Sequence, residues 1–367
     1  TIPNRIVVEP MTQFSAEDGV AGDWHIMHLG QFAVSGAGMV LSESCYIEAI
    51  ARNHPSCLSI YTDEQEAGVG RVCSFFRNQG SAAFGVQLCH GGRKASSRPH
   101  WEGGGKLALE DGGYEAVAPS PVPIKEGWPV PRELSLTEIQ AIISMFADSA
   151  VRAARAGCHV VELHSAHGYL IHEFLSPITN RRTDKYGGSL ENRMRFGLEI
   201  FEAVRAAWPE DKPLGIRISA SDWVTGGWDL ESSVTFARRL DELGCDFIDV
   251  SSGGLSPEQK IESGPGYQTG FAARIKSEVK MKVITVGQIT EARQAETILR
   301  TGQADMIGLA RIMLFNPRWP WLAAQELGAE AIYAKQYERA HPSRWAIPGV
   351  SAPGNQPTQP VERGAAD

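Results

Sequence analysis

The sequence predicts an α/β protein of the (β/α)8 TIM-barrel class, and three observations support this. Short β-rich runs recur along the chain, segments with the helical spacing of apolar residues separate them, and the runs number eight. Eight strands in strand–helix alternation close into a parallel barrel. At 367 residues the chain could hold two domains, yet a barrel of this class uses about 250 residues or more as one domain.

The eight candidate strands are short and rich in β-branched residues. In chain order they cover residues 5–9, 39–43, 83–88, 159–163, 214–219, 247–251, 283–286 and 306–310. The clearest helix covers residues 137–156, because it follows Ser135, a residue type that caps helix starts, and ends at Gly157. Further helices are expected over residues 192–208, 232–243, 271–279 and 292–299.

Two segments interrupt the alternation. Residues 96–134 are rich in Gly, Pro and Trp and have no helical period, so we expect a lid-like insertion after the third strand. Residues 341–367 are rich in Pro and polar residues and are expected to form an irregular C-terminal tail. Residues 1–340 are thus expected to be one barrel domain. Because Thr1 lies almost directly before the first strand, we also expect that an N-terminal piece is missing.

Composition argues against several classes of partner. The formal net charge of −8 and the pI near 5.7 disfavour nucleic acid or an anionic membrane surface as the main partner. No apolar run approaches the roughly 18 residues of a membrane-spanning helix. The six cysteines show no C-x-x-C spacing and no disulfide framework, which favours a reducing compartment, and we expect the cytoplasm.

The segment 164–169, with the sequence HSAHGY, places two imidazoles and a phenol directly after a predicted strand. His164 and His167 can both polarise one electronegative atom by hydrogen bonding, and Tyr169 can deliver a proton to the neighbouring carbon. The trio suits an acid-assisted reduction. Two alternatives are open. The histidines could be a metal pair, although no spacing suggests a third ligand, or a satisfied pair in the core, which Gly168 and the polar run beyond it disfavour.

A barrel of this class has its active site at the C-terminal ends of its strands, so the residues at the other strand ends are candidates for it. They are Pro10, Met11 and Thr12 after the first strand, Glu43 and Ser44 on the second, Gln87, His90 and Arg93 on the third, and Arg217 within the fifth. A phosphate site is expected after strands seven and eight, where Gly287, Ala310 and Arg311 lie. For Arg217 and Arg311 the alternative is a salt bridge at the barrel rim. No G-x-G-x-x-G or P-loop motif occurs, so a nicotinamide cofactor would share this mouth with the substrate.

Several of these runs together resemble the Old Yellow Enzyme family of flavin-dependent ene-reductases, and the resemblance covers nearly the whole chain. The runs are 3–7 (PNRIV), 87–94 (QLCHGGRK), 164–169 (HSAHGY), 173–177 (EFLSP) and 180–193 (NRRTDKYGGSLENR). The run 336–339 (QYER) and the insertion around Trp101 are similar to the thermophilic-like subgroup that includes the xenobiotic reductases.

The resemblance implies a barrel that binds FMN tightly and noncovalently. The flavin ring would contact Pro10, Met11, Thr12, Ser44, Gln87 and Arg217, and the phosphate would lie on Gly287, Ala310 and Arg311. Hydride from NADPH or NADH would pass through flavin N5 to the Cβ of an α,β-unsaturated carbonyl compound. His164 and His167 would bind the carbonyl oxygen, and Tyr169 would protonate Cα. The expected partners are enones and related electron-poor alkenes, without nucleic acid or membrane, and the expected assembly is a homodimer or a dimer-based homo-oligomer.

The chain departs from the subgroup at three positions. Thr12 stands where the subgroup usually has Cys, and Phe14, a candidate substrate contact, stands where it usually has Tyr. Substrate preference therefore cannot be carried over. Ala310 replaces a common Gly in the phosphate loop. The resemblance also implies that Arg339 contacts substrate across a dimer interface, with a surface arginine on a tail helix as the alternative.

Other functions compete with the ene-reductase. Within the family, a reductase of nitro compounds or nitrate esters would need the flavin hydride but not Tyr169. A flavin-binding sensor would not turn over, and a metal-dependent barrel hydrolase would need a ligand set that the sequence does not predict. The absence of Cys after Cys245 argues against the larger dienoyl-CoA reductase-like relatives, which carry an iron–sulfur cluster. Trp319 and Trp345 could line the mouth, with packing as the alternative.

Overall fold

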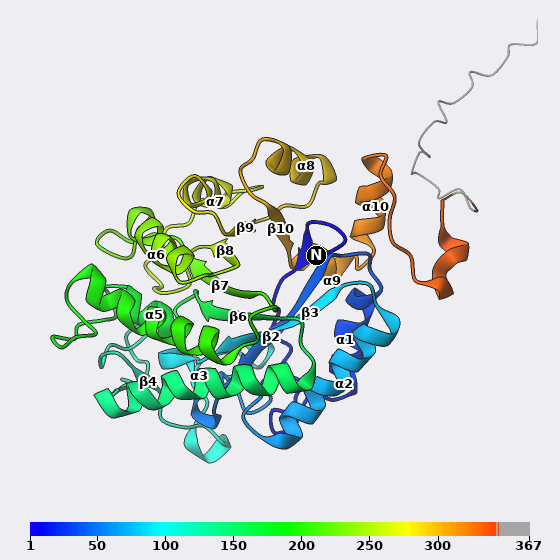
Figure 1. The fold of residues 1–367 in the computed structure, drawn as a ribbon. Coiled ribbons are helices and arrows are strands. Elements are labelled where there is room, and N and C mark those ends of the chain that lie inside the picture. Colours follow the sequence, from blue (N-terminus) through cyan, green and yellow to red (C-terminus); the bar gives the residue numbers. More distant parts are fainter. Residues whose placement is uncertain (343, 345–367) are drawn as a thin grey trace, which may run out of the picture.

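The computed structural model describes residues 1–342 and 344. Eight parallel strands form a closed barrel in the order β1-β10-β9-β8-β7-β6-β3-β2, and helices surround it (Figure 1). The strands are β1 (Ile6–Val8), β2 (Met39–Tyr46), β3 (Ala83–Cys89), β6 (Val160–Ser165), β7 (Leu214–Ser219), β8 (Phe247–Ser251), β9 (Lys282–Thr285) and β10 (Met306–Leu309). The predicted fold class, a (β/α)8 TIM barrel, is confirmed.

All eight predicted strands are present, and their bounds differ mainly at the ends. Strands β7 and β8 begin and end where the sequence predicts. Strand β2 continues beyond its predicted end at residue 43 to Tyr46, and a register shift between Leu41 and Ser44 marks a bulge in it. Strand β6 continues to Ser165, so His164 lies inside the strand and not in the loop after it.

The helices lie on the outside of the barrel. They are α1 (Asp23–Ala33), α2 (Asp63–Gln79), α3 (Leu136–Ala156), α4 (Leu170–Leu175), α5 (Leu190–Ala207), α6 (Leu230–Glu242), α7 (Thr269–Lys276), α8 (Ala292–Arg300), α9 (Arg311–Phe315) and α10 (Trp319–Glu326). Helix α3 has the predicted caps, because the Ser135 side chain accepts from a backbone N–H and Gly157 adopts φ 93°. Helix α2 is not among the predicted helices. Its two glycines lower helix propensity, yet Gly68 lets α2 approach Ala21 closely.

The barrel interior is apolar at one end and polar at the other. At the N-terminal ends of the strands an apolar cluster fills it, formed by Val7, Met39, Leu41, Val160, Phe247 and Ile284. A side chain on Gly215 would reach within 2.2 Å of the Phe247 ring, so this layer is closely packed. Nearer the C-terminal ends lies a layer of buried polar side chains, Glu9, Gln87, Glu162, Arg217 and Asp249. The candidate site is built above this polar layer.

The insertion after β3 is largely irregular and is tied to the barrel mouth. Its only paired strands are the two-residue β4 (Val117–Ala118) and β5 (Arg132–Glu133). Arg93, directly after β3, donates to the backbone oxygen of Pro123 in the insertion at 3.0 Å. The same guanidinium donates to the backbone oxygen of Leu255 after β8 at 2.7 Å. Arg93 therefore fixes the insertion to the loops at the mouth.

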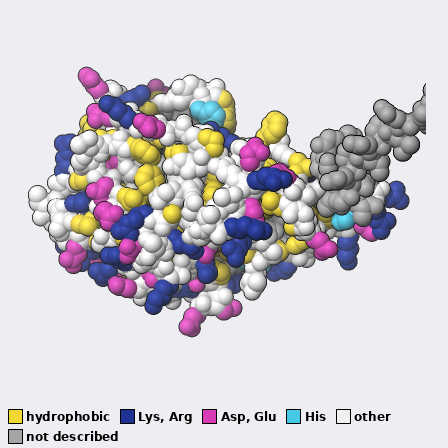
Figure 2. Space-filling view, turned by 90° about the horizontal axis from the view of Figure 1, so that it is seen from above, with side chains coloured by type: hydrophobic (Ala, Val, Ile, Leu, Met, Phe, Trp, Pro, Cys, Tyr) yellow, Lys and Arg dark blue, Asp and Glu magenta, His cyan; other side chains and the backbone are white. Residues whose placement is uncertain are grey.

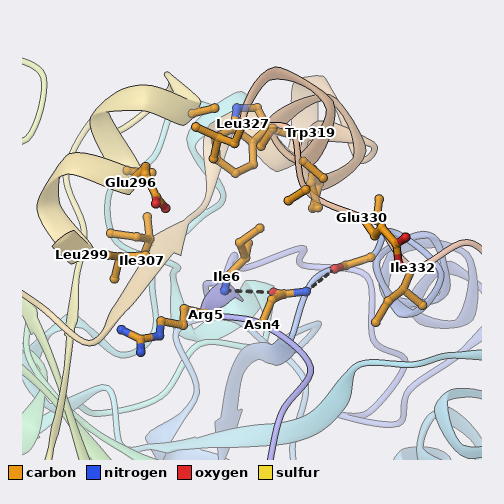
Figure 3. A pocket seen from close by; sticks show the side chains of 18 of the residues that line it. Asn4, Arg5, Ile6, Glu296, Leu299, Ile307, Trp319, Leu327, Glu330 and Ile332 are labelled. Carbon is orange, nitrogen blue, oxygen red and sulfur yellow. Dashed lines mark hydrogen bonds between the residues drawn. The ribbon is translucent and has the colours of Figure 1, made fainter. Parts of the chain in front are cut away.

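A cavity of about 580 Å³ lies at the opposite end, between the start of β1, α8 and α10 (Figure 3). Trp319 lines this cavity, and its indole N–H donates to the backbone oxygen of Thr290 at 2.7 Å. Packing, the alternative for this tryptophan, is therefore what the structure shows. Trp345 and most of the predicted tail lie outside the described residues.

The surface seen from above carries mixed charge. Basic and acidic side chains are interspersed over the face in Figure 2, without a continuous basic stripe of the kind that follows a nucleic-acid backbone. Within residues 1–342 and 344, no helix has both the length and the apolar composition needed to cross a membrane.

Candidate active site

His164 is the last inward-facing residue of β6 and is buried. The backbone N–H of Ala166 donates to its Nδ1 at 3.2 Å, so the ring hydrogen is on Nε2, which can donate to a ligand. Burial, and after it the cation of Arg217, lowers the pKa of His164 well below its usual range. The ring is therefore neutral near pH 7 and acts as a hydrogen-bond donor.

His167 lies in the turn after β6 with a left-handed backbone, at φ 57°. Its backbone N–H donates to Ser219 Oγ at 2.9 Å, and its Nε2 lies 2.8 Å from Ser251 Oγ. The two imidazole rings have centroids 5.2 Å apart and are nearly perpendicular, at 89°. Burial, followed by Arg217, also lowers the pKa of His167 well below its usual range. The part of the chain that the structure describes contains no cluster of three His, Cys, Asp or Glu suited to a metal ion.

Tyr169 lies beside His164, with ring centroids 4.7 Å apart and an angle of 81° between the rings. Its phenol oxygen accepts a hydrogen bond from Asn53 Nδ2 at 2.9 Å, a contact that is not predicted from the sequence. Burial raises the pKa of Tyr169 above its usual range, so the phenol keeps its proton at neutral pH. The structure thus brings the three predicted catalytic side chains into one cluster.

A buried network fixes the turn that carries this cluster. The Gly168 N–H donates to His172 Nδ1 at 2.9 Å, and His172 Nε2 lies 2.8 Å from Asp222 Oδ1. Both side chains are fully buried. Gly168 adopts φ 73°, which glycine accepts without strain. His172 and Asp222 are not among the predicted site residues. The only sequence signal that could have indicated this network is a histidine four residues after Gly168.

Arg217 lies inside β7 between two buried carboxylates. Its Nη1 is 3.0 Å from Glu9 Oε2 and its Nε is 2.7 Å from Asp249 Oδ2, so the salt-bridge alternative holds, within the barrel interior. Burial opposes the charged form, but Asp249 and Glu9 outweigh it and raise the pKa of Arg217. Arg217 is also the register partner of His164. A permanent cation therefore lies beside the histidine cluster.

A chain of hydrogen bonds links Ser44, Gln87 and Glu162 across three neighbouring strands. Ser44 Oγ donates to Gln87 Oε1 at 3.1 Å, and Gln87 Nε2 donates to Glu162 Oε1 at 2.7 Å. All three side chains are buried. Burial, and after it the negative charge of Asp249, raises the pKa of Glu162 to about 8. This carboxyl is therefore largely protonated in the folded protein near neutral pH.

We expect Glu162→Gln to reduce the pH dependence of stability. A carboxyl with a folded pKa of about 8 and an ordinary value of 4.5 adds stability that is fully present below pH 4.5 and lost as pH rises toward 8. Glutamine does not titrate, and its oxygen can still accept from Gln87. Melting temperatures between pH 5 and 8 should fall more steeply in the wild type. Glu202→Gln, on the exposed face of α5, is the control, and equal slopes in all three proteins would contradict the assignment.

The segment after β1 carries the expected flavin contacts Pro10, Met11 and Thr12, which are half-buried. The backbone N–H of Gln13 donates to Glu43 Oε2 at 2.9 Å, and Glu43 Oε1 lies 3.1 Å from His25 Nε2. Glu43 and His25 are both buried. Glu43, which the sequence marks only as a strand end, therefore holds this segment in place.

Phe14 has a left-handed backbone, at φ 50°, and belongs to an aromatic edge of the mouth. Its ring meets Trp101 of the insertion edge-on, with centroids 5.4 Å apart, and His54 at 6.0 Å. Trp101 is 59% exposed, so this edge is open to a ligand. Phe14 offers an apolar surface here and no hydrogen-bond donor.

The three expected phosphate residues lie after the neighbouring strands β9 and β10. Gly287 adopts φ 119°, and a side chain there would meet Gln268 Nε2 at 2.9 Å, so only glycine leaves the backbone accessible. Ala310 precedes α9, and Arg311 is its exposed first residue. Arg311 forms no ion pair with any described residue, so the salt-bridge alternative does not apply within this part of the chain.

Arg339 is exposed and lies in the short helical turn Lys335–Ala340. That turn is on the outer side of the molecule, beyond α10 (Figure 1). The structure therefore does not bring Arg339 to the histidine cluster of its own chain.

The residues at the mouth fit the expected FMN. One buried carboxyl oxygen, Glu162 Oε2, has no hydrogen-bond partner among the described residues. It lies in the same layer as Arg217, and the protonated Glu162 carboxyl and the Arg217 guanidinium can both donate to the carbonyl groups of a polar ring. At the expected phosphate position, after β9, the backbone of Gly287 has no side chain and permits the close approach that a phosphate needs.

The chain matches known flavin oxidoreductases over most of its length. A profile of the NADH:flavin oxidoreductase / NADH oxidase family matches residues 1–330. The chain is 44% identical over 341 residues to the NADPH dehydrogenase of Geobacillus sp. (strain WCH70), covering 92% of this chain and 95% of that protein. It is 40% identical over 341 residues to the NADPH dehydrogenase of Geobacillus thermodenitrificans (strain NG80-2), with the same coverage.

Solved structures agree with this match. A structure of morphinone reductase in complex with tetrahydroNAD is similar with a TM-score of 0.73 and 29% identity, over 90% of this chain and 89% of that chain. A 2-naphthoyl-CoA reductase complex has a TM-score of 0.78 at 24% identity, over 89% of this chain and 50% of that chain. The second likeness supports the fold alone.

Proposed function

Because the chain belongs to the NADH:flavin oxidoreductase / NADH oxidase family, the Old Yellow Enzyme family, and is a flavin-dependent oxidoreductase that uses NAD(P)H, we propose that it is an ene-reductase. The proposed reaction reduces the C=C bond of an α,β-unsaturated carbonyl compound. One observation carries the proposal: His164 and His167, both neutral, lie against each other beside the protonated phenol of Tyr169.

The residues that would hold FMN surround this cluster. They are Pro10, Met11, Thr12, Ser44, Gln87 and Arg217 at the ring, and Gly287, Ala310 and Arg311 at the phosphate. When bound, FMN supplies a hydride carrier between NADPH or NADH and the substrate. Arg217 would place a fixed positive charge at the ring, in a layer where burial strengthens electrostatic interactions.

The chain's own side chains would activate the substrate and complete the reduction. His164 Nε2–H would donate to the carbonyl oxygen, which draws electron density from Cβ. Ser251 Oγ lies 2.8 Å from His167 Nε2 and 3.4 Å from Gln268 Oε1, and by donating its one hydrogen to the nearer His167 it would leave the ring hydrogen of His167 on Nδ1 for the same oxygen. Tyr169 would then give its phenol proton to Cα. Hydride at Cβ and a proton at Cα together convert C=C to a saturated bond.

To test the proposal, the flavin is first reduced with NADPH in the absence of oxygen. Enones, maleimides and nitro compounds are then added separately to the reduced protein. Enones and maleimides should restore the oxidised flavin spectrum, because they have an oxygen for the histidines and a carbon for the proton. If nitro compounds alone restored it, the protein would be a nitro or nitrate-ester reductase. If NADPH failed to reduce the flavin at all, a sensor role would be favoured.

Assembly and location are part of the proposal. A homodimer is supported by the exposed position of Arg339 away from the site of its own chain, since the resemblance places such an arginine in the neighbour's mouth. A cytoplasmic location is supported by six buried cysteines, none of which forms a disulfide.

A further inference from the structure

Asn53, a residue outside the predicted site, contacts the phenol of Tyr169. Asn53 lies in the loop after β2, two residues beyond the short helical turn Ala49–Ala51. Its Nδ2 donates to the Tyr169 phenol oxygen at 2.9 Å. The backbone of Asn53 is itself held, because its carbonyl oxygen accepts from the Ser97 N–H at 2.6 Å. The loop after β3 therefore fixes where this amide lies.

The direction of this hydrogen bond limits where the phenol hydrogen can point. A phenol oxygen accepts hydrogen bonds and has one hydrogen to donate. The Asn53 N–H cannot accept that hydrogen, so the hydrogen must be directed elsewhere. The ring beside Tyr169 is that of His164, which is expected to bind the carbonyl oxygen of the substrate. The phenol hydrogen is thus left for the side of the pocket where Cα would lie.

We propose that Asn53 is a positioning residue for the proton transfer from Tyr169, an inference that rests on the proposed ene-reduction. In this transfer the O–H bond of Tyr169 breaks and a Cα–H bond forms, while the electron pair of the O–H bond stays on the phenolate oxygen. The Asn53 N–H keeps its hydrogen bond to that oxygen, and a hydrogen bond to a charged acceptor is stronger than one to a neutral acceptor. Water returns the proton afterwards.

Among the other groups near the phenol, only Tyr46 also acts on it by a hydrogen bond within the described residues. The titratable ones are His164, Lys94, Tyr46, Cys57 and Cys89. Lys94 Nζ lies 5.6 Å from the ring centroid and donates instead to the backbone oxygens of His167 and Gly254. Burial raises the pKa of Tyr169, and hydrogen bonds from Asn53 and, after it, from Tyr46 work in the opposite direction. Asn53 is therefore the stronger of the two neighbouring donors that would stabilise the phenolate.

Two substitutions separate the hydrogen bond from packing. Asn53→Ala removes the donor, and Asn53→Asp keeps the shape but replaces the N–H with an acceptor that would hold the phenol hydrogen. With Tyr169 present, cyclohexenone reduction by the holoenzyme should fall about 10-fold for Asn53→Ala and further for Asn53→Asp. In the Tyr169→Phe background neither substitution should slow the reaction further, because the phenol is absent. Flavin content, read from absorbance, shows whether each variant is folded.

A second readout follows Tyr169 without turnover. In protein labelled with ¹³C at tyrosine Cζ, the signal that Tyr169→Phe removes reports the ionisation of this phenol. The pKa of Tyr169 should rise in Asn53→Ala and rise further in Asn53→Asp. Asn78→Ala is the matched control, because Asn78 is exposed on α2 and its side chain donates, among the described residues, only to Ser74 Oγ. It should leave both readouts unchanged.

Four results would count against the proposal. Full activity in Asn53→Asp would overturn it, because an acceptor at position 53 would then serve as well as a donor, and the Asn53 N–H would not be what matters. Further slowing by Asn53→Ala in the Tyr169→Phe background would also overturn it, because the effect would be structural. If Tyr169→Phe alone left enone reduction unchanged, Tyr169 would not be the proton donor and the role of Asn53 would fail with it, whereas a wild-type protein that reduces no enone would overturn the proposed function. If Tyr169→Phe slowed enone reduction but the Asn53 variants kept the wild-type rate, only the role of Asn53 would be removed.

Discussion

Tyr169→Phe should slow the reduction of cyclohexenone by about 10²- to 10⁴-fold, the range by which a positioned general acid accelerates a reaction. The phenol is protonated, since burial raises its pKa, and lies against the ring of His164. Phenylalanine keeps the ring packing and removes only the proton. The rate at which NADPH reduces the flavin should change little, because that half of the cycle transfers no proton from Tyr169.

Stopped-flow measurement of the two half-reactions separates these effects. Tyr61→Phe is the matched control, because Tyr61 lies two residues before α2, lines a hollow against α3, and its phenol forms no hydrogen bond with the described residues. It should leave both half-reactions at the wild-type rate. Unchanged enone reduction in Tyr169→Phe would show that the proton reaches Cα from another donor or from water.

Arg217→Leu should destabilise the folded protein by about 3–5 kcal/mol, because it leaves Glu9 and Asp249 buried without their cation. The guanidinium is nearly enclosed, so solvent cannot replace it. Arg293→Leu offers a matched control. Arg293 lies 3.0 Å from Glu326, but its side chain is 78% exposed, and removal of such a pair should cost about 0–1 kcal/mol.

The loss in Arg217→Leu should depend on pH. Burial already raises the pKa of Glu9 and Asp249, and removal of Arg217, which lowers both, would raise them further. Carboxyls with raised folded pKa values contribute stability at low pH that is lost as pH rises through those values. Urea unfolding should therefore show a smaller gap between wild type and variant at pH 5 than at pH 8. A gap that does not change with pH would mean that the two carboxyls stay protonated throughout.

The barrel could be predicted from sequence because its signals are local. Strands β7 and β8 are short buried runs with clear ends, and both begin and end where predicted. The bulge between Leu41 and Ser44 has no such signal, which explains the underestimated length of β2. Gly68 weakens the local helix pattern of α2, while its value for close packing against Ala21 depends on the fold.

In the candidate site, too, residues with a local sequence signal could be predicted, and contacts that depend on the fold could not. His164, His167 and Tyr169 could be predicted because parallel strands end at one edge of the barrel, and the three residues lie near the end of a single strand, with His164 inside it and the other two after it. Asn53 is 116 residues from its partner Tyr169, and Asp222 is 50 residues from His172. Those contacts depend on how distant loops meet, and no spacing in the sequence reports them.

A bound flavin should take hydride from NAD(P)H, and this site should pass it to an enone. Anaerobic titration of the purified protein with NADPH, followed by cyclohexenone, measures both steps in one experiment. We predict that NADPH bleaches the flavin absorbance and that cyclohexenone restores it with formation of the saturated ketone. Protein that contains no flavin and cannot be reconstituted with FMN, or reduced flavin that enones do not reoxidise, would contradict the account.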